Sequence, residues 1–291
     1  MKPVQARDLW RLARPETLPA SLVPVAVGTA AAGLTGPLSP LWTADVLLVA
    51  LLLQIGTNMA NELFDYRRGL DRPGAVGIAG VLVSGRMRPR TLGFLTAGVY
   101  ALAVLLGAAL AAARGPVLLL LGLLAAALSL AYSAGPRPVA ATPFGEALVF
   151  LLMGPLEVGV AEVAAGGRLT AAALWASLPV GLTVAAILLA NNTRDLEKDR
   201  EHGRRTLAIL LGRERAARLL EGLLLGAPLL ALPMAAGGLL PASSLLALLA
   251  LPLALRLRKR LFLGNPVPPA GAFHLVSGLL LAAGLALAAL L

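Results

Sequence analysis

Long runs of apolar residues, separated by short joints that are polar or rich in Gly and Pro, dominate the pattern along this chain. Each run approaches the roughly 20 residues that an α-helix needs to cross a lipid bilayer. Gly and Ala recur within the runs, which permits close helix packing in a membrane. We predict membrane-spanning helices over residues 17–35, 43–64, 91–113, 115–134, 143–163, 170–192, 223–240, 242–256 and 272–290. The pattern therefore predicts an all-α integral membrane protein in which residues 1–291 form a single domain of about nine transmembrane helices.

The composition supports a membrane protein and adds an excess of positive charge. Hydrophobic residues make up 58% of the chain, charged residues only 14%, and the mean hydropathy is +0.83. A soluble chain is about one quarter charged. Nevertheless, 25 Lys and Arg residues against 15 Asp and Glu residues give a net charge of +10. A nucleic-acid-binding protein would carry such charge on a polar, solvated face, so we expect no nucleic-acid partner.

The residue types that are missing or rare exclude several kinds of chemistry. The chain has no cysteine, which excludes disulfides, thiol nucleophiles and thiolate metal sites. Its two histidines are too few for a three-His zinc centre. No Gly-Lys pair occurs, so a Walker A nucleotide-binding loop is excluded. The high apolar content also excludes an intrinsically disordered chain.

The basic residues fall on one side of the predicted membrane layout. All 25 Lys and Arg residues except Arg114 and Arg168 lie at the N-terminus or in the joints after the second, fourth, sixth and eighth predicted helices. Cytoplasmic segments are enriched in Lys and Arg, so we predict a cytoplasmic N-terminus and an outside C-terminus. The first sixteen residues are polar and mixed in charge, unlike a cleaved signal peptide. We expect a multi-pass protein of the cell (inner) membrane.

Two clusters of acidic and amide residues lie on this predicted cytoplasmic side, in segments at about 61–90 and 191–220 that we interpret as loops. In NELFDYRRGLD, Asn61 and Asp65 precede Asp71, and in NNTRDLEKDRE, Asn191 and Asp195 precede Asp199. Both clusters contain the spacing N-x-x-x-D. On a helix, residues i and i+4 share a face. We therefore predict that Asn61 and Asp65 point the same way, as do Asp195 and Asp199.

The two clusters predict a site for Mg²⁺ and a diphosphate that faces the cytoplasm. Carboxylate and amide oxygens suit Mg²⁺, which usually takes one or two protein carboxylates and completes its shell with water and phosphate oxygens. The arginines among the acids can bind phosphate through two parallel hydrogen bonds. At the mouth of an apolar bundle, such a site suits a diphosphate with a lipid tail. The alternative is that these residues are ordinary helix caps and surface ion pairs.

Around these motifs the chain resembles the UbiA superfamily of membrane prenyltransferases, and within it most closely the branch that acts on 1,4-dihydroxy-2-naphthoate in menaquinone synthesis. The resemblance covers most of the chain in order: ARPETLPASLVPVAVGTA (13–30), QIGTNMANELFDYRRGLD (54–71), SGRMRPRTL (84–92), YSAGPRP (132–138), FGEALVFLLMGP (144–155) and NNTRDLEKDREHGRRTLAILLG (191–212). It implies a helix bundle around a central cavity, with a membrane-open groove for the polyprenyl chain. The implied reaction is polyprenyl transfer from a polyprenyl diphosphate to an aromatic acceptor. In this branch the acceptor loses CO₂ and gives demethylmenaquinone.

The resemblance also implies roles for individual residues. The implied metal ligands, which would hold two Mg²⁺ ions that bridge the diphosphate, are Asn61, Asp65, Asp71, Asp195 and Asp199. The implied diphosphate contacts are Arg14, Arg137, Lys198 and Arg204. The four aspartates and Tyr132 are the implied catalytic residues, and Tyr132 with Arg137 would close over the reacting carbon. Membrane lipid is the expected surrounding, and no required protein partner is expected.

The chain departs from the branch at several acidic positions. Glu62 and Leu63 stand where the branch commonly has Asp-Tyr, so we expect a different metal geometry there. VAEV at 160–163 replaces a stretch that often carries tyrosines. Carboxyl groups within a predicted span are functional by default. We nevertheless expect Glu162, near the outer end, to be solvated, whereas Glu157 is open to an acceptor contact or a helix–helix hydrogen bond.

Two other functions remain compatible with the sequence. The same chemistry could act on hydroxybenzoate, homogentisate, a glyceryl ether, haem or chlorophyllide. The chain could also be a secondary transporter, because many carriers contain duplicated halves. Carriers usually place their coupling carboxylates near the middle of the bilayer, whereas the acids of this chain gather at one face. The sequence therefore favours the prenyltransferase.

Overall fold

The computed structural model describes residues 4–71, 79–263 and 265–291, and only the backbone of residues 258–263. Throughout this described part the chain forms helices and turns, with no β-strand. It forms two compact units, one made of residues 1–18 with 48–140 and the other of residues 19–47 with 141–291. Of the basic residues used to predict orientation, Lys2 and Arg72 and the side chains of Arg258, Lys259 and Arg260 lie outside the described residues.

Six helical segments among the described residues are long and apolar enough to cross a membrane. They are α3 (Pro40–Arg67), α4 (Pro89–Arg114), the segment Gly145–Gly166, α8 (Ala171–Arg194), the segment Arg213–Ala236 and α14 (Val267–Leu290). Three shorter apolar helical segments are α2 (Pro19–Gly33), α5 (Val117–Ser133) and Ala242–Leu257. All of these coincide with runs that the sequence predicts as spans. An all-helical, multi-pass membrane protein is therefore confirmed, while the number nine and the orientation of the termini stay predictions.

The first unit is built from α1 (Ala6–Ala13), η1 (Pro15–Thr17), most of α3, α4 and α5. Its buried core includes Leu12 of α1, Met59 and Leu63 of α3, Val81 of the α3–α4 connection and Leu92 of α4. A polar link joins three of its helices, because the Tyr100 hydroxyl lies 3.0 Å from Ser129 Oγ and 3.4 Å from Thr57 Oγ1. The long helices are thus tied by polar groups as well as by apolar contacts.

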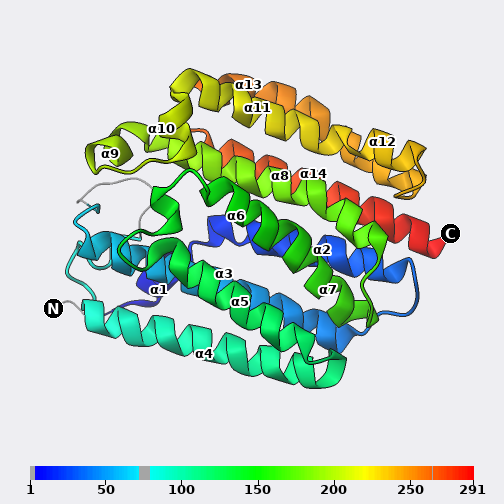
Figure 1. Ribbon diagram of the computed structural model, residues 1–291, viewed down its shortest axis with the longest axis horizontal. Coiled ribbons are helices and arrows are strands. Elements are labelled where there is room, and N and C mark those ends of the chain that lie inside the picture. The colour runs from blue at the N-terminus through cyan, green and yellow to red at the C-terminus, as the bar shows by residue number, and fades with distance from the viewer. Residues whose placement is uncertain (1–3, 72–78, 264) are drawn as a thin grey trace. The chain divides into compact units, whose positions relative to one another are not determined.

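The second unit contains the remaining helices. In chain order these are α2, α6 (Gly145–Leu151), η3 (Leu152–Leu156), α7 (Glu157–Gly166), α8, α9 (Leu196–Glu201), α10 (Leu207–Leu211), α11 (Arg213–Leu229), α12 (Ala231–Ala236), η4 (Ala242–Ala250), α13 (Leu251–Leu263) and α14. Within this unit α14 packs against α2, α8 and η4, α2 packs against α7, and α8 packs against α6 and α11 (Figure 1). One buried cluster joins α2, α7, α8 and α14, and a second joins α8, α11 and α14.

His274 forms a buried polar link at the centre of the second unit. It lies on α14, with its Nδ1 atom 2.7 Å from Thr183 Oγ1 of α8 and its Nε2 atom 3.2 Å from the Pro19 carbonyl of α2. The Thr183 hydroxyl also lies 2.9 Å from the Val180 carbonyl and 3.1 Å from the Pro179 carbonyl of its own helix, to which it can donate. His274 therefore serves the packing of three helices.

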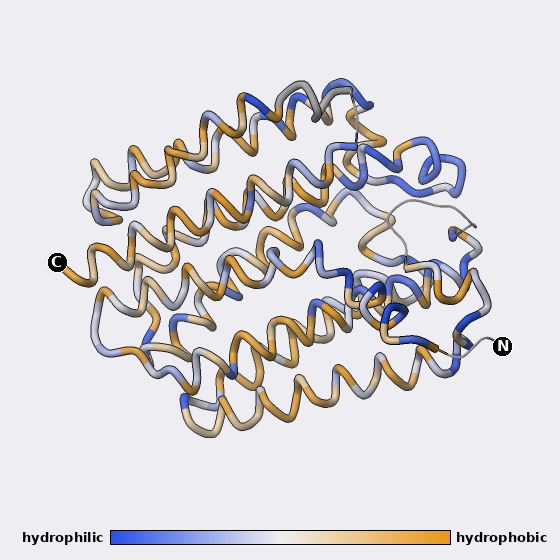
Figure 2. Tube along the Cα trace, turned by 180° about the vertical axis from the view of Figure 1, so that it is seen from behind, coloured by the Kyte–Doolittle hydropathy of each residue, from blue (hydrophilic) through white to orange (hydrophobic). Residues whose placement is uncertain are grey.

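Apolar residues cover most of the length of the helices, and hydrophilic residues gather around α9 and the turns beside it (Figure 2). On α4 and α5 of the first unit, large apolar side chains point outward; Phe94 is 79% exposed, Leu105 68% and Leu120 66%. Exposed apolar surface on this scale marks contact with another apolar phase.

Helices extend into both segments that the sequence predicts as loops, and the one at about 191–220 is largely helical. Helix α3 continues to Arg67, and α11 begins at Arg213, ten residues before the predicted span at 223. Hydropathy places the end of a span where charges begin, whereas an α-helix continues as long as its backbone hydrogen bonds and side-chain pairs support it. At the start of α11, Arg218 pairs with Glu214 one turn away. Arg213, Arg215 and Arg218 therefore lie on a helix.

Candidate functional site

The first Asp motif lies on the last two turns of α3 and the turn that follows. Asn61 and Asp65 are half-buried and one helical turn apart on the same helix, as predicted. The helix ends at Arg67, and Gly69 follows in the left-handed conformation, whose φ of +70° favours glycine. The Leu70 N–H donates to the Asp65 carbonyl (3.0 Å) and the Gly69 N–H to the Tyr66 carbonyl (3.0 Å), the two bonds of a Schellman cap. Asp71 follows this cap directly.

Glu62, inside the same motif, binds the backbone of the α3–α4 connection. Its side chain is buried, at 1% exposure. Its Oε2 atom accepts from the Ala79 N–H (2.9 Å), and its Oε1 atom accepts from the Val81 N–H (3.0 Å). Both carboxylate oxygens are thus engaged by backbone donors. From the sequence we expect Glu62 to alter the metal geometry. The structure instead gives it a structural role, because it binds the α3–α4 connection, and the sequence motif alone does not reveal this role.

We expect Glu62→Gln to destabilise the first unit while leaving the Mg²⁺ requirement unchanged. The amide nitrogen of Gln cannot accept a hydrogen bond, so one buried backbone N–H loses its acceptor, at a cost of about 1–3 kcal/mol. Thermal unfolding in detergent micelles measures the loss, with Glu16→Gln, at an exposed position of η1, as the control. An unchanged unfolding midpoint together with a raised Mg²⁺ requirement would contradict this role.

Arg14 lies in a turn that α3 holds in place. It ends α1 in the left-handed conformation, with φ 49°, and it is half-buried. The buried Asn58 amide donates to the Ala13 carbonyl (2.9 Å) and to Thr17 Oγ1 (2.9 Å), and the Thr17 hydroxyl donates to the Arg14 carbonyl (2.9 Å). Asn58 is a positioning residue that the sequence analysis missed. Its signal is an amide side chain within an apolar span, where polar groups are costly.

An ion pair between Asp8 and Arg86 joins α1 to the α3–α4 connection. Asp8, 1% exposed, accepts the Gln5 backbone N–H (3.0 Å) and the Arg86 guanidinium (2.6 Å). The Gln5 hydrogen bond first, and then the Arg86 side chain, lower the pKa of Asp8 from its usual value. The side chain therefore stays charged at neutral pH. The first unit thus uses two buried carboxylates, Glu62 and Asp8, to bind Ala79, Val81 and Arg86 of this connection.

Tyr132 and Arg137 lie at the C-terminal end of α5 and in the turn after it. Tyr132 is half-buried and Arg137 is exposed. The turn is connected to the first Asp motif through Arg68, which donates from Nη2 to the Ser133 carbonyl (2.6 Å) and the Gly135 carbonyl (2.9 Å). Its Nη1 atom lies 3.6 Å from Asp65 Oδ1. The structure therefore brings the implied catalytic end of α5 and the first Asp motif together within one unit.

The second Asp motif lies where α8 ends and α9 begins, in the second unit. Asp195 is the residue between these helices, and the Asp199 N–H donates to its carbonyl at 2.8 Å, which places the two aspartates one helical turn apart at the start of α9. Arg194 pairs with Asp195 through two hydrogen bonds of 2.9 and 2.6 Å. Asp199 is buried and accepts from Arg204 Nη1 at 3.2 Å. The break occurs because Asp195 leaves helical geometry at φ −93° and ψ 9°.

Neighbouring polar residues hold this motif against α6. The Asn192 amide donates to Glu146 Oε1 at 2.8 Å, and both side chains are buried. The Arg205 N–H donates to the Ala141 carbonyl at 2.9 Å, which fastens the segment after α9 to the residues before α6. Lys198 is half-buried on α9. The buried Glu146–Asn192 pair joins residues 46 positions apart, so sequence spacing could not predict it.

The two acids of α7 are placed differently from one another. Glu162 is 0% exposed and accepts the Thr170 N–H (2.8 Å) and the Thr170 hydroxyl (2.5 Å) at the start of α8. The expectation that Glu162 is solvated is wrong, because it binds the residue that caps the next helix. Glu157 lies close to Ser21 of α2. This neighbour favours the helix–helix hydrogen bond among the two alternatives for Glu157.

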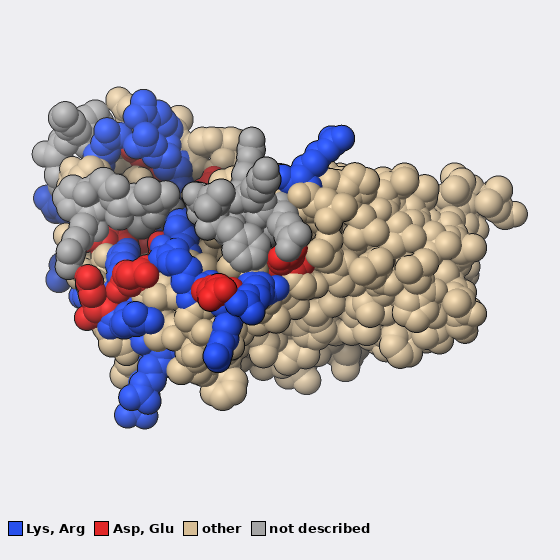
Figure 3. Space-filling model, turned by 90° about the horizontal axis from the view of Figure 1, so that it is seen from above, with Lys and Arg blue, Asp and Glu red and all other residues tan. Residues whose placement is uncertain are grey.

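Charged side chains gather toward one end of the face in Figure 3, and the rest of that face is uncharged. Among the residues that the structure describes, no three His, Cys, Asp or Glu side chains group together as a metal site. Asp65, Asp195 and Asp199 are each paired with an arginine. Each motif thus places carboxylate oxygens, which can act as metal ligands, beside guanidinium groups.

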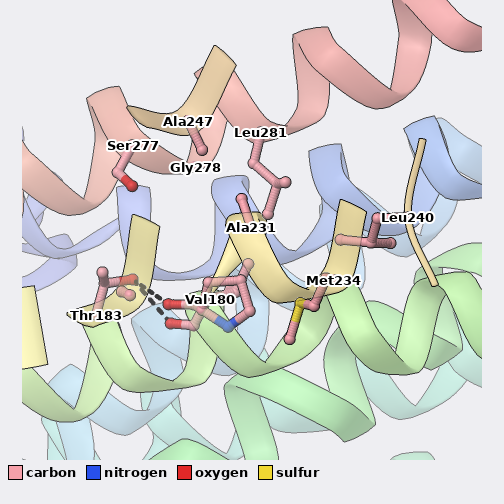
Figure 4. Close-up of a pocket in the computed structure, with 11 residues that line it drawn as sticks. Val180, Thr183, Ala231, Met234, Leu240, Ala247, Ser277, Gly278 and Leu281 are labelled. Atoms are coloured by element: carbon pink, nitrogen blue, oxygen red, sulfur yellow. Dashed lines mark hydrogen bonds between the residues drawn. The ribbon is translucent and has the colours of Figure 1, made fainter. Parts of the chain in front are cut away.

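A small pocket of the second unit lies apart from these residues. It is lined by apolar side chains of α8, α11, α12, η4 and α14, with Thr183 and Ser277 as its polar members (Figure 4). Its volume is about 10 Å³, whereas a cavity that holds a benzene ring has roughly 150 Å³. None of the predicted site residues lines it. This pocket is too small for an aromatic acceptor.

Comparison with known proteins identifies the family. A model of the UbiA prenyltransferase family matches residues 21–279, nearly the whole chain. The chain belongs to this family. It is thereby a prenyltransferase, as the motifs on α3 and around Asp195 predict.

Several curated proteins are similar over most of this chain. One from Bacillus subtilis, named 1,4-dihydroxy-2-naphthoate octaprenyltransferase, is 40% identical over 73% of this chain and 68% of its own length. Proteins of the same name from Mycobacterium tuberculosis and Escherichia coli are 36% and 32% identical over 73% of this chain, and over 72% and 71% of their own lengths. Another relative, UbiA prenyltransferase domain-containing protein 1 of Xenopus tropicalis, is 33% identical over 68% of this chain and 58% of its own length.

Solved UbiA structures share the fold. A homologue from Aeropyrum pernix in its apo form aligns with a TM-score of 0.71 and 21% identity, over 92% of this chain and 96% of that chain. A homologue from Archaeoglobus fulgidus bound to DMAPP and Mg²⁺ aligns with a TM-score of 0.69 and 21% identity, over 98% of this chain and 100% of that chain. The described helices therefore follow the UbiA fold.

Proposed function

We propose that this protein transfers a polyprenyl group from a polyprenyl diphosphate to 1,4-dihydroxy-2-naphthoate, with loss of CO₂, to give demethylmenaquinone. We infer the acceptor from the 40% identity to a 1,4-dihydroxy-2-naphthoate octaprenyltransferase over 73% of the chain. Prenyl transfer itself follows from membership of the UbiA family. The further relatives of the same name support this acceptor over hydroxybenzoate, homogentisate or a glyceryl ether.

We further propose that Mg²⁺ binds with the diphosphate, which fits the donors present. Asp65 and Asp195 are partly exposed, at 30% and 29% of the side chain, and each carboxylate lies beside an arginine. Carboxylate oxygens are ligands that Mg²⁺ accepts, and guanidinium groups bind phosphate. A UbiA homologue bound to DMAPP and Mg²⁺ supports this chemistry. Asn61, Asp65 and Asp71 in one motif, with Asp195 and Asp199 in the other, are the proposed ligands.

The pairing within the second motif suggests how its arginines take part. Arg194 uses two donors on Asp195, and Arg204 uses one on Asp199. When these carboxylates bind a cation instead, the guanidinium groups can turn to the diphosphate oxygens. Arg14 and Lys198 are the further cations proposed to contact the diphosphate, with Arg137 from the turn after α5. The aspartates and arginines would therefore exchange partners as substrate binds.

The proposed reaction breaks the bond between the first prenyl carbon and the diphosphate oxygen, whose electron pair leaves with diphosphate. Bound Mg²⁺ would neutralise charge on this leaving group. The ring carbon that carries the carboxylate forms the new bond to the prenyl carbon. The carboxylate then leaves as CO₂, and its bonding electrons return to the ring. Tyr132 is proposed to lie against the reacting carbon, and the apolar helices would keep water from the allylic cation.

A panel of acceptors tests the proposal. Purified protein, Mg²⁺ and geranylgeranyl diphosphate are incubated with 1,4-dihydroxy-2-naphthoate labelled at its carboxyl carbon, or with hydroxybenzoate, homogentisate or a glyceryl ether. We expect a prenylated naphthalenediol by mass spectrometry and one labelled CO₂ per product. Product from another acceptor alone would overturn the naphthoate assignment. Substrate flux in proteoliposomes without any prenylated product would overturn the transferase and favour a carrier.

We also propose that the N-terminus and both Asp motifs face the cytoplasm of the cell (inner) membrane, as the distribution of Lys and Arg supports. The absence of native cysteine allows a direct test. In bacterial cells, Glu201→Cys on α9 should resist a membrane-impermeant maleimide, whereas Arg168→Cys, between α7 and α8, should react. The reverse pattern would overturn the orientation.

A further inference from the structure

We propose that Arg68 is a positioning residue that holds the α5 turn, defined as residues 132–137, beside Asp65 of the first Asp motif. The inference rests on the proposed function, because it gives Arg68 a part in prenyl transfer. All of the groups concerned belong to the first unit. Neither the sequence motif nor the resemblance assigns Arg68 a role.

The contacts of Arg68 join two segments that are far apart in the sequence. Nη2 donates to the Ser133 carbonyl at 2.6 Å and to the Gly135 carbonyl at 2.9 Å, 65 and 67 positions further along the chain. Nη1 of the same guanidinium lies 3.6 Å from Asp65 Oδ1. One planar group therefore sets the position of the α5 turn relative to the carboxylate.

One of the two carbonyls that Arg68 binds, that of Ser133, lies at the end of a helix and needs a donor from outside it. Helix α5 ends at Ser133, and the last carbonyls of a helix have no partner within it. They also carry the negative end of the helix dipole, which favours a cation. Ser133 itself is buried, at 3% exposure, so water does not easily replace the guanidinium. Beyond it the chain turns at Gly135, with φ +89°.

Arginine suits this place better than lysine. Its guanidinium has five N–H donors in a rigid plane, whereas the lysine ammonium is a single point on a flexible stem. Two carbonyls and a carboxylate can be reached at once only by the planar group. The Arg68 side chain is 27% exposed, so it is partly shielded from solvent that would weaken these contacts.

The arrangement has two consequences of opposite sign. Because Tyr132 precedes Ser133 and Arg137 follows Gly135, loosening the α5 turn should misplace both residues and slow the transfer step. A displacement of about 1 Å can lower a rate roughly 100-fold. The positive charge beside Asp65, however, competes with a cation for that carboxylate. Removing Arg68 should therefore tighten Mg²⁺ binding while it slows turnover.

Arg67 provides a matched control. It is the neighbouring residue on α3, carries the same charge and is exposed. Both side chains lie 5.8 Å from the Phe64 ring. Among the described residues, however, only Arg68 of the two hydrogen-bonds to the α5 turn. Arg67→Gln thus removes an equal charge without removing the contact.

The experiment compares Arg68→Gln, Arg68→Lys and Arg67→Gln with the unmodified protein in detergent micelles. Hydrogen exchange reports on the amides of the α5 turn. Calorimetric titration of Mg²⁺, in the presence of the unreactive thio analogue of geranylgeranyl diphosphate, reports on metal affinity. Steady-state assays give kcat and KM for the prenyl diphosphate. Thermal unfolding shows that each variant is folded, and Arg68→Lys supplies the data if Arg68→Gln fails to fold.

We expect the Arg68 variants to show faster exchange in the α5 turn, about 10- to 100-fold lower kcat and tighter Mg²⁺ binding, with Arg67→Gln unchanged within about 2-fold. Unchanged exchange in the turn would overturn the proposal, whether or not the protein transfers prenyl groups. Weaker Mg²⁺ binding in folded Arg68 variants would also overturn it. If the unmodified protein prenylates no acceptor while exchange responds as expected, the proposed function fails and the structural link stands.

Discussion

Asp65→Ala and Asp195→Ala are each expected to abolish prenyl transfer, with losses of at least about 10³-fold, while the protein stays folded. Each substitution removes a proposed Mg²⁺ ligand, and stabilisation of the departing charge is commonly the largest contribution to such catalysis. Their side chains are 30% and 29% exposed and paired with arginines near solvent. Partly exposed ion pairs contribute only about 0–1 kcal/mol to stability. Loss of activity should therefore occur without loss of fold.

The measurement pairs product formation with thermal unfolding for each variant. Glu201→Ala is the matched control for Asp195→Ala, because it removes an exposed carboxylate from α9, six positions further along the chain. We expect Glu201→Ala to keep both normal turnover and normal stability. Calorimetry should show that Asp65→Ala and Asp195→Ala lose Mg²⁺ binding in the presence of the thio analogue. Turnover equal to the unmodified protein in either pure aspartate variant would refute the metal assignment.

The membrane helices could be predicted from the sequence because hydropathy is a local property. A run of about 20 apolar residues indicates by itself that the segment lies in a membrane, and no contact with a distant residue is needed to interpret it. The same holds for Asn61 and Asp65, whose spacing places them one turn apart on α3. Prediction failed at the ends of the runs. There, pairs such as Glu214 with Arg218 extend a helix beyond the apolar residues.

The supporting contacts of the candidate site could not be predicted, because they join residues distant in sequence. Glu62 is a residue type that can bind a metal, but its two carboxylate oxygens accept hydrogen bonds from backbone N–H groups 17 and 19 positions away. Glu162 binds Thr170, so an acid that resembled a solvated group is buried. Asp195 ends α8 and begins α9, a break that the N-x-x-x-D spacing does not show. Spacing indicates which residues can meet, whereas tertiary packing decides which of them do.

Gly28→Ala is expected to have a large effect on stability, although it adds a single methyl group. Gly28 lies on α2, where it meets α7 within the second unit. A Cβ atom at this position would lie 2.3 Å from the Val158 carbonyl oxygen and 2.8 Å from the Ala161 Cβ. The first of these contacts is with backbone, which cannot turn away as a flexible side chain can. The two helices would have to separate.

Separating α2 from α7 should cost more in this protein than a methyl group costs at most positions. Helices in a membrane associate through close packing, because lipid offers their apolar surfaces an equally apolar alternative. Overpacking in a filled core costs about 1–3 kcal/mol. Gly271→Ala on α14 is the control, because its Cβ would meet nothing within 4 Å. Thermal unfolding in micelles should show a lower midpoint for Gly28→Ala and an unchanged or higher one for Gly271→Ala, since alanine favours helices over glycine by about 1 kcal/mol. Equal midpoints for the two variants would mean that α2 and α7 do not meet this closely in solution.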